Sequence, residues 1–165
     1  MTNETFVAWL QSTLLPRHYP NDLSEQVPPG YLLFRKGAYV CLAMPFRDVP
    51  PGDHGSRQAK ALIRSAMTCL PIVAEKGLFL IYYGEGTRWG EVAPRFTVDK
   101  TALRPVILQS VHFIDPASGA NVNSRTHWGP LKFGFCGPLI ADIESLAAWI
   151  AQGGGQPDAG GGGRY

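Results

Sequence analysis

The sequence predicts an α+β fold, with a mostly antiparallel β-sheet and three helices packed on it. Three segments repeat apolar residues with the 3.6-residue period of a helix, and other segments form the short apolar runs typical of strands. Several of these runs are separated by short turns, as in hairpins, and helices do not alternate with strands as in doubly wound parallel folds. The expected order is therefore α-β-β-α-β-β-β-β-α, followed by a flexible glycine-rich tail.

The N-terminal segment predicts a helix that begins after Thr2 or Asn3, either of which can cap it. Its apolar positions follow the helical period: Phe6, Trp9, Leu10 and Leu14. Pro16 disfavours helical geometry in the residue before it, so the helix is expected to end at Leu15. Residues 16–30 contain four prolines and are expected to form an irregular, extended connection.

A hairpin and a second helix are predicted next. The apolar runs 31–34 and 38–45 are separated by a charged, glycine-containing break at 35–37, which is typical of a hairpin turn. The second helix is expected to follow a Pro- and Gly-rich turn, with Asp53 or Ser56 as its cap. Its apolar face holds Ala59, Leu62, Ile63, Ala66, Met67 and Leu70.

The most strand-like stretch is Leu78–Tyr83, and its apolarity on both faces predicts a central strand. A third helix is expected from Pro138 to about Ile150, with Gly153 ending it. Between them, residues 115–119 contain Asp, Pro and Gly, which are typical of a turn. The remaining strands are expected at 92–98, 104–114, 120–126 and 132–136.

Residues 1–152 are predicted to form a single domain, and residues 153–165 a flexible tail. Residues 153–163 contain seven glycines and no large apolar side chain, so this segment has almost nothing to bury. The core of the domain is expected to include Leu62, Met67, Leu80, Ile81, Val106 and Ile143.

Composition and cysteine content bear on location. The 165 residues are 45% hydrophobic and 17% charged, which is typical of a folded domain. The N-terminus lacks the basic region of a signal peptide, and the longest apolar run is far shorter than the roughly 20 residues that span a bilayer. Cys41, Cys69 and Cys136 show no C-x-x-C spacing. We therefore expect a cytoplasmic protein without membrane contact, disulfides, metal or cofactor.

Positive charge gathers in one third of the chain. Residues 31–76 hold seven Lys and Arg against three acids. Among them, Arg57, Lys60 and Arg64 recur at helical spacing, opposite the apolar face of the second helix. Like charges at this spacing repel each other, so phosphate groups are candidate partners for the three side chains. A plain solvated helix face is the alternative explanation.

A hairpin turn and nearby aromatic residues extend this basic set. Arg35 and Lys36 lie in the predicted turn, and Tyr31, Tyr39 or Tyr83 would be exposed for stacking. Cationic side chains along the phosphate backbone of the nucleic acid, together with aromatic rings that stack on its bases, are typical of single-stranded nucleic-acid binding. The basic set therefore predicts weak, sequence-tolerant binding to a single strand.

Cys136 is the candidate for enzyme chemistry. It lies just before a predicted helix start, where amide groups and the helix dipole favour the nucleophilic thiolate. The base would be His112 or His127, and Asp115 could orient the imidazole. A small thiol buried where a strand meets a helix is the alternative.

Two other kinds of site are disfavoured. The four histidines show no metal-binding spacing, and no Asp or Glu is followed two residues later by Lys, as common metal-dependent nucleases require. We therefore expect a binding module without catalysis, with nucleic acid as the first candidate ligand. The alternatives are a small cysteine-dependent enzyme centred on Cys136, and a subunit of a larger assembly or self-associating protein.

Overall fold

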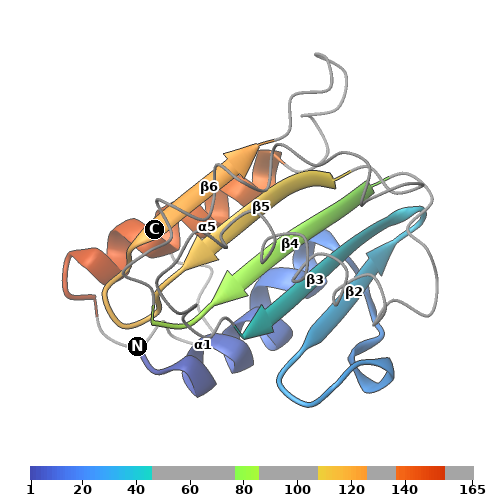
Figure 1. Ribbon diagram of the computed structural model, residues 1–165, viewed down its shortest axis with the longest axis horizontal. Helices are drawn as coiled ribbons and strands as arrows, with labels where there is room; N and C mark the ends of the chain where they lie inside the picture. Colours follow the sequence, from blue (N-terminus) through green and yellow to red (C-terminus); the bar gives the residue numbers. More distant parts are fainter. Residues whose placement is uncertain (46–76, 86–107, 126–136, 155–165) are drawn as a thin grey trace, which may run out of the picture.

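The computed structural model (Figure 1) describes residues 1–45, 77–85, 108–125 and 137–154. Several predicted elements lie outside these ranges: the second helix, the strands at 92–98 and 132–136, and most of the glycine-rich tail. Three predicted core residues, Leu62, Met67 and Val106, lie outside them as well. The described residues form a six-stranded sheet with helices on one side.

The strands follow one another across the sheet in the order of the sequence. Their bounds are β1 Asn21–Asp22, β2 Leu32–Lys36, β3 Tyr39–Pro45, β4 Gly77–Tyr83, β5 Leu108–Ile114 and β6 Asn121–Arg125. Strands β1, β2 and β3 pair antiparallel, as do β5 and β6, whereas β3–β4 and β4–β5 are parallel pairs. The sheet is therefore mixed, with parallel strands at its centre and antiparallel strands at both sides.

The two predicted hairpins are confirmed, and so is the central position of β4. Strand β2 pairs with β3 around Gly37, which has a φ of +58°. Strand β5 pairs with β6 around the turn at 115–119. Strand β4 lies between β3 and β5, and its side chains from Leu78 to Tyr83 are all buried.

The N-terminal helix is longer than predicted and changes its hydrogen-bond pattern along its length. It consists of α1 (Asn3–Trp9), the π-helical turn η1 (Leu10–Leu14) and α2 (Leu15–His18). Thr2 caps its start, as expected, by accepting a hydrogen bond from the Thr5 amide at 3.2 Å. The predicted end at Leu15 is wrong. Because Pro16 has no amide hydrogen, the wider π turn, in which the Leu15 amide donates to the Leu10 carbonyl, lets the helix continue past it.

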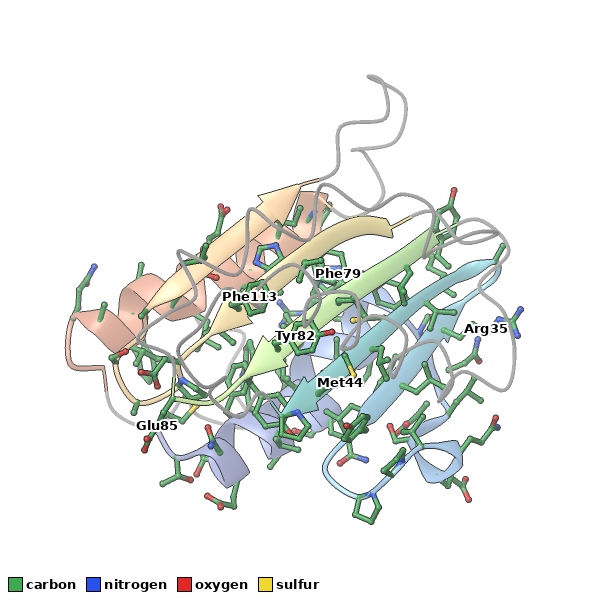
Figure 2. The ribbon with its side chains drawn as sticks, in the orientation of Figure 1. Arg35, Met44, Phe79, Tyr82, Glu85 and Phe113 are labelled. Carbon is green, nitrogen blue, oxygen red and sulfur yellow. The ribbon has the colours of Figure 1, made fainter. Side chains whose placement is uncertain are left out.

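The N-terminal helix and the C-terminal helix pack on the same face of the sheet. In Figure 1, α1 and the C-terminal helix α5 (Gly137–Ala151) lie behind the strands. Their apolar side chains join one core with alternate strand residues such as Cys41, Phe79 and Ile81. The opposite face is buried too, and there Tyr82 and Phe113 stack with ring centroids 5.2 Å apart (Figure 2). The predicted core residues Leu80, Ile81 and Ile143 are confirmed as buried.

The helix α5 fits its prediction and is held by a close backbone contact. Gly153, with a φ of +79°, follows its last turn, and its amide donates to the Ile150 carbonyl. Gly119, in the turn between β5 and β6, lies directly against the helix with a φ of +74°. A Cβ atom at this position would lie 2.4 Å from the Ala147 carbonyl oxygen, so only glycine fits here.

Among the described residues, none of the helices combines the length and the apolarity needed to cross a bilayer.

Candidate functional site

Two of the five predicted nucleic-acid-binding residues are described. Arg35 lies near the end of β2, points outward (Figure 2), and donates from its Nε atom to the Gly37 carbonyl oxygen at 2.7 Å. Lys36, beside it, is exposed. Arg57, Lys60 and Arg64 lie outside the described residues, so the predicted basic set stays a prediction.

Tyr83 is not the exposed stacking residue that the sequence suggested. Its side chain is only 4% exposed, its ring packs against Phe6, and its hydroxyl donates to the Gly30 carbonyl oxygen. Burial, and to a lesser extent the nearby Tyr31, raise the pKa of Tyr83 to about 12. Tyr31 and Tyr39 are half-buried. The expected stacking role of Tyr83 is therefore wrong, because its ring belongs to the core.

Of the residues in the enzyme hypothesis, the structure describes His112 and Asp115. His112 is fully buried on β5, where its ring stacks on Phe79 with centroids 5.3 Å apart. Asp115 does not orient it, because the Asp115 carboxylate accepts hydrogen bonds from the Ala117 amide and the Ser118 hydroxyl of the following turn. His127 and Cys136 lie outside the described residues. A Cys136–histidine pair therefore stays untested, but Asp115 is committed to the turn.

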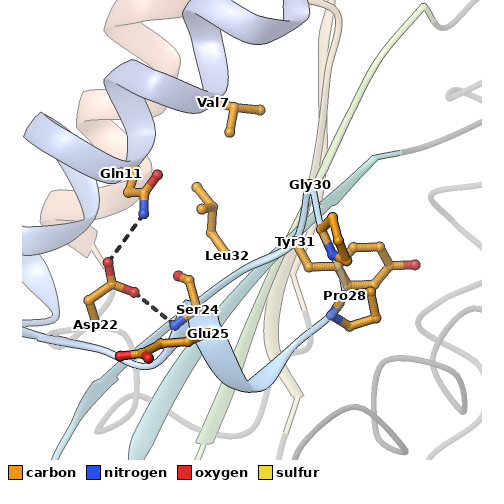
Figure 3. Close-up of a pocket in the computed structure, with 10 residues that line it drawn as sticks. Val7, Gln11, Asp22, Ser24, Glu25, Pro28, Gly30, Tyr31 and Leu32 are labelled. Atoms are coloured by element: carbon orange, nitrogen blue, oxygen red, sulfur yellow. Dashed lines mark hydrogen bonds between the residues drawn. The ribbon is translucent and has the colours of Figure 1, made fainter.

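A groove runs between the N-terminal helix and the segment that leads into β2 (Figure 3). After the helix, the chain forms β1, the short 3₁₀ turn η2 (Ser24–Gln26) and two consecutive prolines. The groove has a volume of about 540 Å³, which is within the usual range for ligand sites. Its described lining residues are Val7, Gln11, Asp22, Ser24, Glu25, Pro28, Pro29, Gly30, Tyr31 and Leu32. The sequence had indicated only an irregular connection here.

One end of the groove is polar and ordered by hydrogen bonds. The Asp22 carboxylate accepts from the Ser24 amide at 2.8 Å and from the Gln11 side-chain amide at 3.4 Å. The Ser24 hydroxyl accepts in turn from the Leu33 amide at 3.1 Å, which ties η2 to β2. Glu25 is exposed and adds a second carboxylate. The described lining holds no Lys, Arg or His, so this end of the groove is negative.

The other end is apolar and its backbone is also held in place. Figure 3 shows Pro28, Gly30 and Tyr31 across the groove from Gln11 and Asp22. Gly30 has a φ of +85°, and its carbonyl accepts the Tyr83 hydroxyl. The Tyr31 amide donates to the Pro28 carbonyl at 2.9 Å. These bonds fix the proline segment as a wall of the groove.

A second polar cluster joins the two helices. The His18 Nε2 atom lies 2.8 Å from an Asp142 carboxylate oxygen on α5, and Arg17 lies 3.4 Å from the same oxygen. The side chains of His18 and Asp142 are 14% and 35% exposed. Sequence reasoning missed this contact because no local spacing links residues so far apart in the chain. Its geometry ties the end of α2 to the first turns of α5.

Metal binding has no support in the described ranges, where no three His, Cys, Asp or Glu side chains gather to hold an ion. Comparisons with protein-family models, curated proteins and solved structures find no match for this chain. The chain's own residues are then the guide to function, and the groove, lined by described residues, is a concave site with convergent polar groups.

Proposed function

We propose that the protein is a binding module and that the groove between the N-terminal helix and β2 receives a segment of another protein. The observation that carries this proposal is the groove itself, about 540 Å³ in volume with a polar and an apolar end. Its walls are ordered by hydrogen bonds through Asp22, Ser24 and Gly30. A site ordered in advance binds at a lower entropic cost than one that must be ordered by its ligand.

The ligand would be held by side-chain contacts rather than by adding a strand to the sheet. Strand addition needs free backbone groups at a sheet edge. Beside the groove, the Leu33 amide already donates to the Ser24 hydroxyl, and the Leu33 carbonyl accepts from the Leu23 amide. The wall of prolines and Tyr31 instead offers an apolar surface for a short extended peptide.

The test is to fill the groove with a larger side chain. Val7 lines the groove from α1 and is half-buried, whereas its neighbour Ala8 is exposed and lies outside the groove lining. We expect Val7→Trp to weaken binding of an array of random heptapeptides at least about tenfold, a loss of about 1.4 kcal/mol. Ala8→Trp, which adds the same side chain one residue away, should bind as the wild type does. Equal binding by both variants and the wild type would reject the groove as the site.

A second candidate is single-stranded nucleic acid, favoured by the exposed Lys36 and the outward Arg35 in the β2–β3 hairpin. It would use a different surface, since the groove is negative. Retention on an oligonucleotide should then weaken with salt by a logarithmic slope of about 0.7 per phosphate contact. Changing Arg57 and Arg64 together to Gln should lower that slope by about 1.4, and Lys100→Gln should leave it unchanged. If the protein binds oligonucleotide in this way and no peptide, nucleic acid replaces the peptide proposal.

A further inference from the structure

We propose that the groove selects a basic segment of its partner, with an arginine or lysine side chain placed at the polar end. This inference rests on the proposed function and names its ligand class. Its basis is charge complementarity: two carboxylates, Asp22 and Glu25, lie at that end, and no described lining residue is cationic. An anionic ligand such as a phosphate would be repelled there.

Asp22 is the better placed of the two carboxylates. One of its oxygens is fixed by the Ser24 amide at 2.8 Å, and the other faces the Gln11 amide at the long distance of 3.4 Å. A carboxylate oxygen can accept two hydrogen bonds, so acceptor sites remain on both atoms. A guanidinium group can use two such sites at once, which gives direction as well as strength. Asp22 therefore has the geometry to orient an arginine side chain.

The apolar part of the groove suits the rest of the same ligand. Arginine and lysine carry aliphatic stems that pack on apolar surface while the charged group reaches a polar partner. Val7 and Leu32 lie between the polar end and the proline wall in Figure 3. A basic side chain would thus lie along Val7 and Leu32, with its peptide backbone and neighbouring residues against Pro28 and Tyr31.

The experiment compares charged and neutral ligands of the same shape. Heptapeptides with apolar flanks carry arginine or its uncharged isostere citrulline at the central position, and affinities are measured by fluorescence polarisation. We expect the wild type to prefer arginine by about tenfold, the strength of one good charge-assisted contact. Because Asp22 and Glu25 are exposed, this preference should shrink clearly between 50 and 500 mM salt.

Three variants test which carboxylate causes the preference for arginine. Asp22→Asn should lower the preference for arginine to about threefold, because it removes the negative charge. The turn should be kept, since an asparagine oxygen can still accept from the Ser24 amide. Glu25→Gln removes an exposed carboxylate for which no orienting hydrogen bond is described, and it should lower the preference about twofold, to about fivefold. Glu85→Gln removes an exposed carboxylate at the end of β4, outside the groove lining, and should leave it unchanged.

The outcomes separate this inference from the function on which it rests. If arginine and citrulline peptides bind equally, and Val7→Trp blocks both, the basic ligand is wrong and the peptide-binding groove stands. If no peptide binds, both proposals fail. A preference for arginine that survives Asp22→Asn and Glu25→Gln together would place the basic contact elsewhere and also overturn the inference. The salt dependence of the wild type decides the matter even if Asp22→Asn fails to fold.

Discussion

The N-terminal helix and α5 cover the same face of the sheet but differ in regularity and in their surroundings. The helix α5 is an uninterrupted α-helix of 15 residues, and the turn at Gly119 presses against its backbone. The N-terminal helix passes through a π turn at Leu10–Leu14, and its residues Val7 and Gln11 line the groove. Single π turns inside helices often occur at functional sites. The regular helix therefore serves packing, while the irregular one also lines the groove that we propose as a binding site.

The largest effect should come from the contact that holds α5. In Gly119→Ala, the new Cβ would lie 2.4 Å from the Ala147 carbonyl oxygen, in a backbone conformation that L-residues avoid. Overpacking and left-handed strain together should lower the free energy of unfolding by about 3 kcal/mol. Urea unfolding followed by circular dichroism measures it.

Gly37→Ala is the matched control. Gly37 also has a positive φ of +58°, but a Cβ there would meet nothing within 4 Å. It should cost only the conformational strain, about 1 kcal/mol. If the two variants lose the same stability, the turn at Gly119 does not press on α5, and the contrast between the helices weakens.

The next effect concerns Tyr83, under the N-terminal helix. Tyr83→Phe removes the hydroxyl that bonds the Gly30 carbonyl and leaves that oxygen without its donor. We expect a loss of about 1 to 2 kcal/mol in the free energy of unfolding at neutral pH. Peptide affinity should also fall a few fold, because Gly30 lines the groove. A loss of stability with unchanged peptide affinity would separate the groove from the core below it.

Alkaline pH tests the same hydroxyl without comparing affinities. Burial raises the pKa of Tyr83 to about 12, whereas an unfolded tyrosine titrates near 10. The folded state therefore keeps its proton longer, so this contribution is complete below pH 10 and falls as the pH rises toward 12. Burial also raises the pKa values of Cys41 and Tyr82. Wild type and Tyr83→Phe share both groups, so their contributions cancel when the two are compared. The stability difference between wild type and Tyr83→Phe should accordingly shrink between pH 10 and 12, and a constant difference would contradict the burial of the hydroxyl.

The sequence predicted the elements whose signals are local. The hairpin β2–β3, the turn at 115–119, the buried Leu80 and Ile81 of β4, and the third helix follow from apolar patterns and turn residues. Strand direction is not local in this sense. The parallel pairs at the centre require the chain to return between strands, and apolar patterns do not record that path. The continuous apolarity of β3 and β4 was the available signal, since parallel strands are buried on both faces.

The groove and the first helix show a second limit. Pro16 indicated a helix end, because proline disfavours helical geometry in the residue before it. The π turn at Leu10–Leu14 lets the helix continue, and such turns have no reliable sequence signature. The four prolines of residues 16–30 indicated irregular chain without showing that it forms a wall. No local pattern in the sequence indicates that Asp22 lies opposite Gln11 of the helix. The prediction of an exposed Tyr83 is wrong because the contact that buries its hydroxyl, with Gly30, joins distant parts of the chain.

The smallest expected effect is that of the His18–Asp142 contact, which joins the two helices directly. A partly exposed ion pair or hydrogen bond contributes little, because solvent screens it and two side chains lose conformational freedom. A double-mutant cycle with His18→Ala and Asp142→Ala should give a coupling free energy of about 0.5 kcal/mol. Arg17→Ala serves as the control, since its guanidinium is more exposed and farther from the same oxygen, and it should change stability less. Peptide affinity should stay constant throughout, because none of these residues lines the groove. If the cycle lowers peptide affinity as well, α5 helps to position the groove through His18, and the two helices do not divide packing and binding between them.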